Sequence, residues 1–565
     1  MKLQAGLAGL FALAHHARAQ CNSTFEDLTA AEFIAAANPA WNLGNTLDAT
    51  PDEGSWNNPP VEAATFDFIK EAGFKSVRIP VTYTHHFLSE GPDYEVDPEW
   101  LQRVSDVIDF AVERDLLVVT NVHHDSWEWA DVSLDDADLT AIQAKFRALW
   151  LQIGEKLACK PSTVAFESIN EPPANTAEDG AAVNQFNSIF VDALAETGGF
   201  NTRRVVTLAG GGNDATKTSQ WFEPPAEIAN PWALQIHYYS PYDFTFSAWG
   251  KTIWGSDADK AAMDTELGVV RGNFTDVPIY VGEFDASPLN TEPAARWKWF
   301  DYFVRAASEV GATVCVWDNG LDHLDRETGV FRDQTVIDIM KNAAAGVANS
   351  LPGSTVDAVA MEQSSSAYIF NKVGDAIEAQ ELPYIFNGNT VTAITASDGT
   401  ELVQGTDYTV GDSAIAFSAE FIGSYISADS APGVYETFTL AFSAGASTTI
   451  QLVQWDVPVL ASTSGSAAAG SDLAIPIEYK GLDEVAAVKM ITNNGTYLVD
   501  DWTQYLGPLQ QARATWDGQW AFDTENVIVR SSIIDIVVGL GQASTFTFEF
   551  YPRVEGNVAE YVITP

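Results

Sequence analysis

The chain has 565 residues, of which 46% are hydrophobic and 12% aromatic, so it can fold into several domains and is not a disordered polymer. It carries 29 Lys and Arg against 77 Asp and Glu, a formal net charge of −48. Such an acidic surface repels phosphate backbones and anionic lipid, which argues against nucleic acid or a membrane as partner and favours an uncharged ligand. Three cysteines cannot build a disulfide scaffold and lack the spacing of a zinc site; Cys21 and Cys159 remain candidates for one bridge.

The first nineteen residues have the pattern of a secretory signal peptide. Lys2 precedes an apolar stretch over residues 5–14, and Ala17-Arg18-Ala19 offers a small-residue cleavage site. No later stretch is long and apolar enough to cross a bilayer. We therefore expect residues 1–19 to be removed, and the mature protein to be secreted, extracellular and monomeric.

From about residue 40 to 345, short β-branched runs alternate with stretches of helical period. Several runs are continuously apolar, as expected for parallel strands that are covered on both faces. Eight strand–helix units in about 310 residues predict a (β/α)8 barrel spanning residues 20–350. A doubly wound sheet is the alternative, but no Gly-rich dinucleotide fingerprint follows the first run. The predicted strands are 41–44, 76–80, 116–122, 163–169, 204–209, 233–238, 278–282 and 312–317.

After residue 350 the composition shifts to Thr, Ser, Val, Ile and Gly, with a predicted strand about every ten residues. This pattern predicts two β-sandwich modules, over residues 351–455 and 456–565. Asn387-Gly388 lies between two apolar runs and predicts a β-hairpin. The aromatic residues Trp502, Tyr505, Trp516 and Trp520 of the last module belong either to a sandwich core or to a binding strip.

Polar side chains follow the predicted barrel strands, where such folds carry their reactive groups. Two carboxylates stand out, because acetal hydrolysis needs one protonated and one ionised carboxyl group at the scissile bond. We assign Glu171 as the acid/base and Glu283 as the nucleophile, kept ionised by Tyr239 and Arg78 nearby. The full set is Asn45, Arg78, His123, His124, Asp125, Asn170, Glu171, His237, Tyr239, Glu283 and Trp317.

A catalytic metal is not expected. His123 and His124 are adjacent, and neighbouring residues at the end of a strand point to opposite sides, which disfavours joint ligation of one ion. No His-Glu-x-x-His helix is present. We expect neither a metal nor an organic cofactor.

Seven segments in register resemble glycoside hydrolase family 5, and most closely its subfamily 4 of endo-β-1,4-glucanases and xyloglucanases. The matching segments are Trp41-Asn42-Leu43-Gly44-Asn45-Thr46-Leu47-Asp48-Ala49, Val77-Arg78-Ile79-Pro80-Val81, His123-His124-Asp125, Ile169-Asn170-Glu171-Pro172, His237-Tyr238-Tyr239, Val281-Gly282-Glu283-Phe284 and Trp317-Asp318-Asn319-Gly320.

The resemblance implies the same two roles for Glu171 and Glu283 in a retaining reaction. It also implies that Arg78 and Tyr239 hold the nucleophile and that Asn170 contacts the sugar 2-hydroxyl. The implied walls of the subsite that holds the reacting sugar are His123, His124, His237 and Trp317, and Asn45, after the first predicted strand, is a further candidate for substrate binding.

Four positions depart from the family pattern: Ala40, Asn57 and Asp285 replace a usual Gly, and Val316 replaces a usual Trp. Asp285 matters most, because an anion two residues after Glu283 can raise the pKa of that nucleophile.

The tail resembles two accessory modules. Residues of about 352–455 are similar to an immunoglobulin-like X2 module, around Phe386-Asn387-Gly388-Asn389-Thr390 and Gly405-Thr406-Asp407-Tyr408-Thr409-Val410. Residues of about 456–565 are similar to carbohydrate-binding module family 46, around Asp501-Trp502 and Trp516-Asp517-Gly518.

The sequence therefore predicts a secreted endo-β-1,4-glucanase acting on cellulose-like, mixed-linkage or xyloglucan chains. A mannanase or xylanase on the same scaffold, and a non-catalytic glucan-binding protein, are the alternatives. Four loop residues, Trp127, Trp129, Trp249 and Trp254, are candidate platforms for further sugars.

Overall fold

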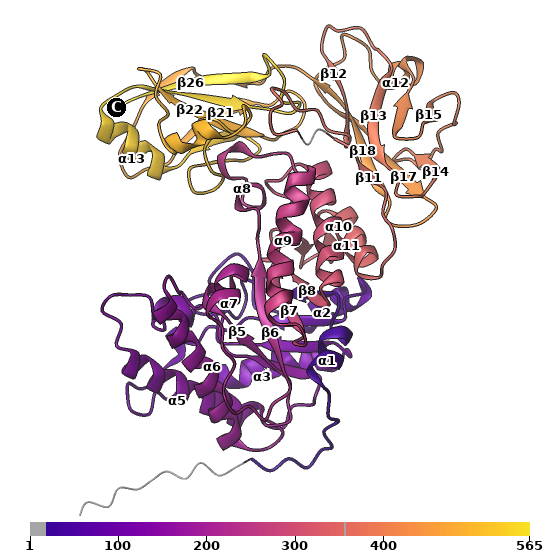
Figure 1. Ribbon diagram of the computed structural model, residues 1–565. Coiled ribbons are helices and arrows are strands. Elements are labelled where there is room, and N and C mark those ends of the chain that lie inside the picture. Colours follow the sequence, from indigo (N-terminus) through magenta and orange to yellow (C-terminus); the bar gives the residue numbers. More distant parts are fainter. Residues whose placement is uncertain (1–18, 355–356) are drawn as a thin grey trace, which may run out of the picture. The chain divides into compact units, whose positions relative to one another are not determined.

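The computed structural model describes residues 19–354 and 357–565, so the predicted signal segment lies outside the described residues except for Ala19. Among the described residues, no helix combines the length and the apolarity needed to cross a membrane. The chain divides into two compact units (Figure 1). One holds the described residues up to 37 with residues 43–236 and 276–280, and the other holds residues 38–42, 237–275 and 281–565.

Eight strands close into a barrel in the order β1-β2-β3-β4-β5-β6-β7-β8, which confirms the predicted fold. The pairs β1–β8, β2–β3, β3–β4, β4–β5 and β5–β6 are parallel, and the predicted apolar runs coincide with the strands to within a few residues. Almost every strand residue is buried, because helices cover the outside and side chains fill the inside. The strands are β1 Ala40–Asn42, β2 Ser76–Ile79, β3 Leu117–Thr120, β4 Val164–Glu167, β5 Val206–Ala209, β6 Trp232–Tyr238, β7 Ile279–Phe284 and β8 Ala312–Val316.

In the first unit, Trp150 fixes a helix pair to the barrel wall. Its ring contacts Phe166 of β4 and Phe190, and its Nε1 donates to the backbone oxygen of Ser168 (3.0 Å). Burying a Trp with its N–H satisfied contributes apolar area without an unpaired polar atom. The helices of this unit are α1 Ala30–Ala36, α2 Ala63–Glu71, η1 Thr84–His86, α3 Pro98–Val112, α4 Asp125–Glu128, α5 Leu139–Leu157, α6 Ala177–Thr197, η2 Gly211–Asn213 and α7 Ala215–Trp221.

In the second unit, α10 lies between α9 and α11 and covers β8 (Figure 1). Local sequence fixes where these helices begin: Ser256 and Asp259 form a capping box for α9, and Pro293 is the first residue of α10. The elements are α8 Tyr242–Thr245, η3 Ala248–Gly250, α9 Asp257–Asn273, α10 Pro293–Glu309, α11 Gln334–Ala344 and the hairpin β9 Leu324–Asp325 with β10 Val330–Phe331.

The middle module has two four-stranded sheets, β11-β13-β16-β15 and β12-β18-β17-β14, and one short helix, α12 Ala419–Tyr425. Asn387 and Gly388 both have positive φ, as in a tight turn, but β13 and β14 on either side belong to different sheets. The predicted hairpin is therefore wrong. The bounds are β11 Leu351–Pro352, β12 Tyr368–Lys372, β13 Gln380–Ile385, β14 Val391–Thr395, β15 Tyr408–Val410, β16 Ala414–Phe417, β17 Gly433–Phe442 and β18 Thr448–Trp455.

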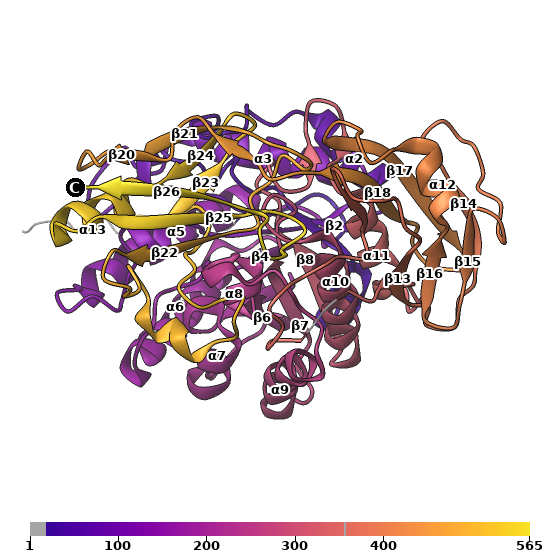
Figure 2. The same cartoon turned by 90° about the horizontal axis from the view of Figure 1, so that it is seen from above.

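The last module also has two sheets, β19-β21-β24-β23 and β20-β26-β25-β22. Figure 2 shows strands β26, β25 and β22 of the second sheet side by side. Its core contains Trp520, with Trp516 packed against it, and helix α13. The bounds are β19 Val459–Leu460, β20 Ser464–Ser466, β21 Leu473–Glu478, β22 Ala487–Thr492, η4 Asp501–Tyr505, β23 Trp520–Phe522, β24 Asn526–Val529, α13 Ser531–Leu540, β25 Ser544–Glu549 and β26 Val558–Thr564.

A disulfide joins Cys21 to Cys159, across 138 residues of sequence, while Cys315 is buried and free. The ion pair of Arg203 with Asp27 holds the same N-terminal segment. Ala19, the last residue of the predicted signal segment, makes two backbone hydrogen bonds to the segment around Gly198. The pair that the sequence left open is thus formed.

Replacing Cys21 and Cys159 by Ser should lower the free energy of unfolding of the barrel by about 5 kcal/mol, because a closed loop of this length restricts the unfolded chain. Calorimetry of wild type and variant, each with and without reductant, measures the effect. Reductant should leave the double variant unchanged. A wild-type melting temperature in the double variant would contradict the stabilising role.

Candidate active site

In the first unit, a buried ion pair organises the ends of β2 and β4. Arg78 is fully buried and donates through Nε and Nη2 to the two oxygens of Glu167 (2.7 Å each). Nη2 also donates to Oδ1 of Asn170 (2.8 Å). Such a bidentate pair orients the Asn170 amide while satisfying the buried charges. Sequence reasoning missed Glu167, although it is the only charged residue in the predicted strand 163–169.

The same network reaches His123. Asn121 Nδ2 donates to Glu167 Oε1 (2.8 Å) and lies 3.1 Å from Nδ1 of His123. Because an amide nitrogen donates, Nδ1 of His123 accepts, and its Nε2 carries the proton. His123 can thus offer an N–H to a sugar hydroxyl.

His123 and His124 do not point to opposite sides, so that prediction is wrong. Strand β3 ends at Thr120, and both residues lie in the loop before α4, with ring centroids 4.5 Å apart. With Asp48 they offer ligand atoms within 4.8 Å of one another. The Asp48 carboxylate, however, already accepts from the backbone N–H groups of Asn45 (3.0 Å) and Thr46 (2.6 Å). That no metal is needed stays a prediction.

Glu171 follows β4 with a left-handed backbone, φ 38°, which is uncommon for a residue with a side chain. Its backbone oxygen accepts from Nε1 of Trp127 (3.2 Å), whose side chain is half exposed and lies against the His124 ring. Strained backbone held by surrounding contacts is typical of functional positions. The Glu171 side chain is partly exposed, as a group that meets a substrate requires.

Asn45 also has a left-handed backbone, φ 52°, and its Nδ2 donates to Oδ1 of Asn57 (2.8 Å). Asn57 occupies a position where the resembled family has a Gly. The departure therefore supplies a hydrogen-bond partner to a predicted substrate-binding residue.

In the second unit, the nucleophile candidate Glu283 lies on β7 and is 6% exposed. Its Oε2 accepts from the Tyr239 hydroxyl (3.0 Å), and Nδ1 of His237 lies 3.5 Å from the same oxygen. A phenol donor favours the ionised carboxylate. Three predicted site residues thus meet here, as Arg78, Asn170 and His123 meet around Glu167 in the first unit.

Two tryptophans after the barrel strands differ in exposure. Trp317 follows β8, is partly exposed, and has its backbone N–H bound to the oxygen of Phe284 (3.0 Å), so its ring can meet a sugar. Trp254 is fully buried against Tyr302, and its predicted role as a sugar platform is wrong. The loop that carries Trp254 folds back into the core just before α9. No local sequence pattern predicts this.

Asp285 forms an ion pair rather than a free anion. Its Oδ1 lies 2.8 Å from Nε2 of His323, which is fully buried. Burial alone would lower the pKa of His323, but the Asp285 carboxylate and its hydrogen bond raise it to about 9. The protonated His323 offsets the charge of Asp285. The Asp285 carboxylate therefore gives no ground to expect a raised pKa for Glu283.

Asp322 completes this cluster and accepts a hydrogen bond from Ser287. Burial, with the nearby Asp285 charge, raises the pKa of Asp322 to about 7. The folded chain therefore binds protons more tightly than the unfolded chain at both Asp322 and His323.

Because both pKa values are raised on folding, the free energy of unfolding should fall as the pH rises. Asp322 contributes this loss between pH about 4 and 7, and His323 between pH about 6.5 and 9. Melting temperatures measured across pH 4–9 test this. Asp322→Asn should flatten the lower range and reduce the upper one only slightly, because the Asp322 charge is the smallest of those that raise the pKa of His323. The exposed control Asp412→Asn should follow the wild-type curve, and identical curves for all three would contradict the assignment.

An aromatic row in the second unit runs from Tyr239 to the last module. Ring centroids are 5.5 Å apart for Tyr239 and Phe246, 4.8 Å for Phe246 and Tyr242, and 5.7 Å for Tyr242 and Trp249. Trp249 then meets Trp502 edge to face at 4.5 Å. Phe246, Tyr242 and Trp502 are each 40–50% exposed, so the row offers apolar faces to solvent.

The last module contacts the segment after β6 and does not hang free. Trp249 Nε1 donates to Asp500 Oδ2 (3.1 Å), and Gln510 Nε2 donates to Asp243 Oδ2 (3.1 Å). Gly250 has φ +65°, and a Cβ there would lie 2.7 Å from Cγ of Arg513, so this close approach requires glycine.

Comparisons with known proteins agree with this architecture. A family model described as cellulase (glycosyl hydrolase family 5) matches residues 37–322, about half of the chain, and one described as carbohydrate binding domain X2 matches residues 363–452. The predicted X2 module is therefore confirmed, whereas the family 46 resemblance of the last module stays a prediction.

Individual relatives extend the similarity beyond the barrel. The crystal structure of a tri-modular family 5 (subfamily 4) endo-β-1,4-glucanase from Bacillus licheniformis, complexed with cellotetraose, is 32% identical, covers 95% of this chain and 99% of that one, and has a TM-score of 0.84. Endoglucanase B of Paenibacillus lautus is 28% identical over 500 residues, 84% of this chain and 83% of the relative. Endoglucanase B of Clostridium cellulovorans is 31% identical over 311 residues, 52% of this chain and 69% of the relative.

Proposed function

The chain belongs to the cellulases of glycosyl hydrolase family 5, and from this premise we propose that it is a secreted, retaining endo-β-1,4-glucanase. The observation that carries the proposal is a closed parallel barrel with one glutamate after β4 and another on β7. Glu171 follows Asn170, whose amide is oriented by Arg78, and Glu283 accepts a hydrogen bond from Tyr239. The carboxyl ends of all eight strands share one rim, where such barrels carry their chemistry.

The proposed reaction has two displacements at the anomeric carbon. In the first, a Glu283 oxygen attacks C1 while the glycosidic C1–O bond breaks, and the leaving oxygen takes the proton of Glu171. In the second, water attacks C1, the ester bond to Glu283 breaks, and Glu171 takes the proton of that water. The product keeps the β configuration, and Glu171 is protonated again.

The local contacts support this division of roles. The Tyr239 hydroxyl stabilises an ionised Glu283, as a nucleophile requires. The Asn170 amide, fixed by Arg78, is placed beside Glu171 to donate to the sugar hydroxyl next to the reacting carbon. The disulfide and the predicted signal segment both fit an oxidising extracellular location.

We infer that the substrate is an uncharged β-1,4-linked glucan of cellulose, mixed-linkage or xyloglucan type. The Bacillus licheniformis relative was crystallised with cellotetraose, and the acidic surface of this chain does not repel a neutral polymer. A product profile across cellulose, barley glucan, xyloglucan, xylan and mannan separates glucanase from xylanase and mannanase action.

Glu171→Gln and Glu283→Gln should both fold normally, and each should lose at least ~10²-fold in turnover of barley glucan, because proton transfer and covalent catalysis are removed. Reducing-sugar release measures the loss, and the exposed Glu227→Gln serves as a matched control with wild-type activity.

Azide distinguishes the two roles. With an activated aryl cellobioside, Glu171→Gln should regain turnover in azide and give a β-glycosyl azide, because azide needs no base. Wild-type turnover in either variant, or an α-azide from Glu171→Gln, would overturn the assignment.

The aromatic row supports a role for the last module in holding polymer. Trp502 is presented beside Trp249, which leads through Tyr242 and Phe246 to Tyr239. A sugar ring meets an aromatic face favourably through its axial C–H bonds.

Trp502→Ala should lower kcat/KM on barley glucan or xyloglucan about tenfold, and change the cleavage of a short cellooligosaccharide by less than twofold. The matched control is Tyr435→Ala, another exposed aromatic residue, in the middle module. Equal losses on long and short substrates would indicate that Trp502 stabilises the fold instead.

A further inference from the structure

The loop between β8 and β9 begins with Trp317 and is folded around one buried carboxylate. Asp318 is fully buried, and its Oδ1 accepts from the backbone N–H of Gly320 (2.9 Å), while its Oδ2 accepts from that of Leu324 (2.9 Å). Nε1 of Trp41 donates to the same Oδ2 (2.7 Å) and so attaches the loop to β1. A carboxylate with several N–H donors gives a loop a defined shape.

A second set of contacts ties this loop to the segment that follows β7. Nε2 of His323 lies 2.8 Å from Oδ1 of Asp285, and the Ser287 hydroxyl donates to Asp322. His323 is fully buried, and the two aspartates are each 5% exposed, so water competes little for these bonds. Below the raised pKa of His323, about 9, the pair with Asp285 joins opposite charges, and charge-assisted hydrogen bonds are the stronger kind.

The two segments that this pair joins each carry a candidate site residue. Glu283 lies two residues before Asp285, and Trp317 opens the loop that contains His323. The backbone N–H of Trp317 donates to the oxygen of Phe284 (3.0 Å), so the two segments are neighbours at their start as well. A shift of about 1 Å in a group that positions a substrate can lower the rate about 10²-fold, so such ties matter for catalysis.

The ion pair is a feature of this chain and not of the family pattern. Asp285 stands where the resembled family has a Gly, and a Gly has no side chain that could pair with His323. A buried ion pair adds little net stability, because the loss of hydration offsets the attraction between the charges. Its fixed geometry is the property that remains, and this supports a role in orienting the loop.

We propose that Asp285 and His323 are positioning residues for the glycosidase reaction. Their ion pair holds the loop of Trp317 against the segment after β7, so that the indole ring and the Glu283 carboxylate meet the same sugar. The inference rests on the proposed function, which gives Trp317 its contact with the sugar and Glu283 its attack on C1. Because Asp285 and His323 are buried, they act through Trp317 and not by touching the substrate.

Asp285→Gly should lower kcat/KM on an activated aryl cellobioside about tenfold at pH 6, where His323 is protonated. Asp285→Asn keeps an acceptor for Nε2 of His323 and should lose less than threefold. The double variant Asp285→Gly, His323→Leu leaves no buried partner unpaired, so it should fold normally and still show the tenfold loss.

A double-mutant cycle with Trp317→Ala separates positioning from a general effect on the fold. If the ion pair acts through the indole ring, its removal matters only while that ring is present. Asp285→Gly should therefore change kcat/KM less than twofold in the Trp317→Ala background. A purely structural effect would instead lower kcat/KM about tenfold in both backgrounds.

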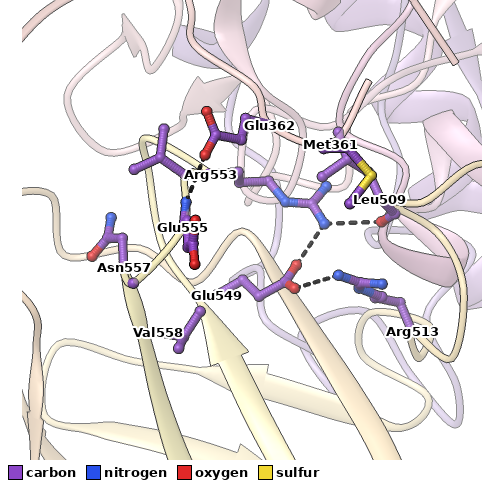
Figure 3. A pocket seen from close by; sticks show the side chains of 11 residues that line it. Met361, Glu362, Leu509, Arg513, Glu549, Arg553, Glu555, Asn557 and Val558 are labelled. Carbon is purple, nitrogen blue, oxygen red and sulfur yellow. Dashed lines mark hydrogen bonds and ion pairs between the residues drawn. The ribbon is translucent and has the colours of Figure 1, made fainter. Parts of the chain in front are cut away.

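A buried ion network in the last module provides the matched control. The guanidinium groups of Arg513 and Arg553 both donate to the Glu549 carboxylate, on which they converge in Figure 3. Glu549→Gln should lower the free energy of unfolding, because it leaves buried charges poorly compensated. It should nevertheless change kcat/KM on the aryl cellobioside less than twofold, which shows that lost stability alone does not reproduce the effect of Asp285→Gly.

Two outcomes would overturn the proposal: wild-type kcat/KM in the folded double variant Asp285→Gly, His323→Leu, or losses from Asp285→Gly and Trp317→Ala that add in full. Failure of the proposed function would show separately, as wild-type turnover in Glu283→Gln.

Discussion

The closed parallel barrel is the constraint on which everything else depends. It brings the carboxyl ends of eight strands to one rim and buries nearly every strand residue, so a polar side chain on a strand must find a partner inside. Arg78 and Glu167 satisfy each other, and Asn121 and Asn170 complete the set. These four side chains therefore form one connected network in the first unit, which explains how they can be both polar and buried without a large cost in stability.

The sequence predicted the barrel well because each strand is a local signal, a continuous apolar run flanked by breakers. What it missed depends on pairing between distant residues. Glu167 was hidden inside a strand, and the partner of Asp285, His323, is 38 residues away. The Asn387-Gly388 turn was recognised correctly, yet its flanking strands join different sheets, which local turn chemistry cannot indicate. Trp254 was misread because a loop residue can fold back into the core.

Two of the four departures from the family pattern are compensated locally. Asp285 replaces a Gly and would leave an anion near Glu283, but the buried His323, whose pKa is raised to about 9, pairs with it. Asn57 replaces another Gly and binds the Asn45 amide. In both cases the added side chain carries a polar group that meets a polar partner.

The last module has a further physical role in its contact with the segment after β6. Ser247 and Trp249 have φ values of 46° and 50°, a left-handed backbone that costs of order 1–3 kcal/mol for each residue that is not glycine. A free loop would relax. Here the backbone oxygen of Ser247 accepts from the N–H of Trp516 (3.3 Å), and the Trp249 indole donates to Asp500. Because the module supplies these contacts, it stabilises the strained backbone that carries part of the aromatic row. Trp249 and Trp502, which are proposed to hold polymer, therefore also form part of the contact between this segment and the last module.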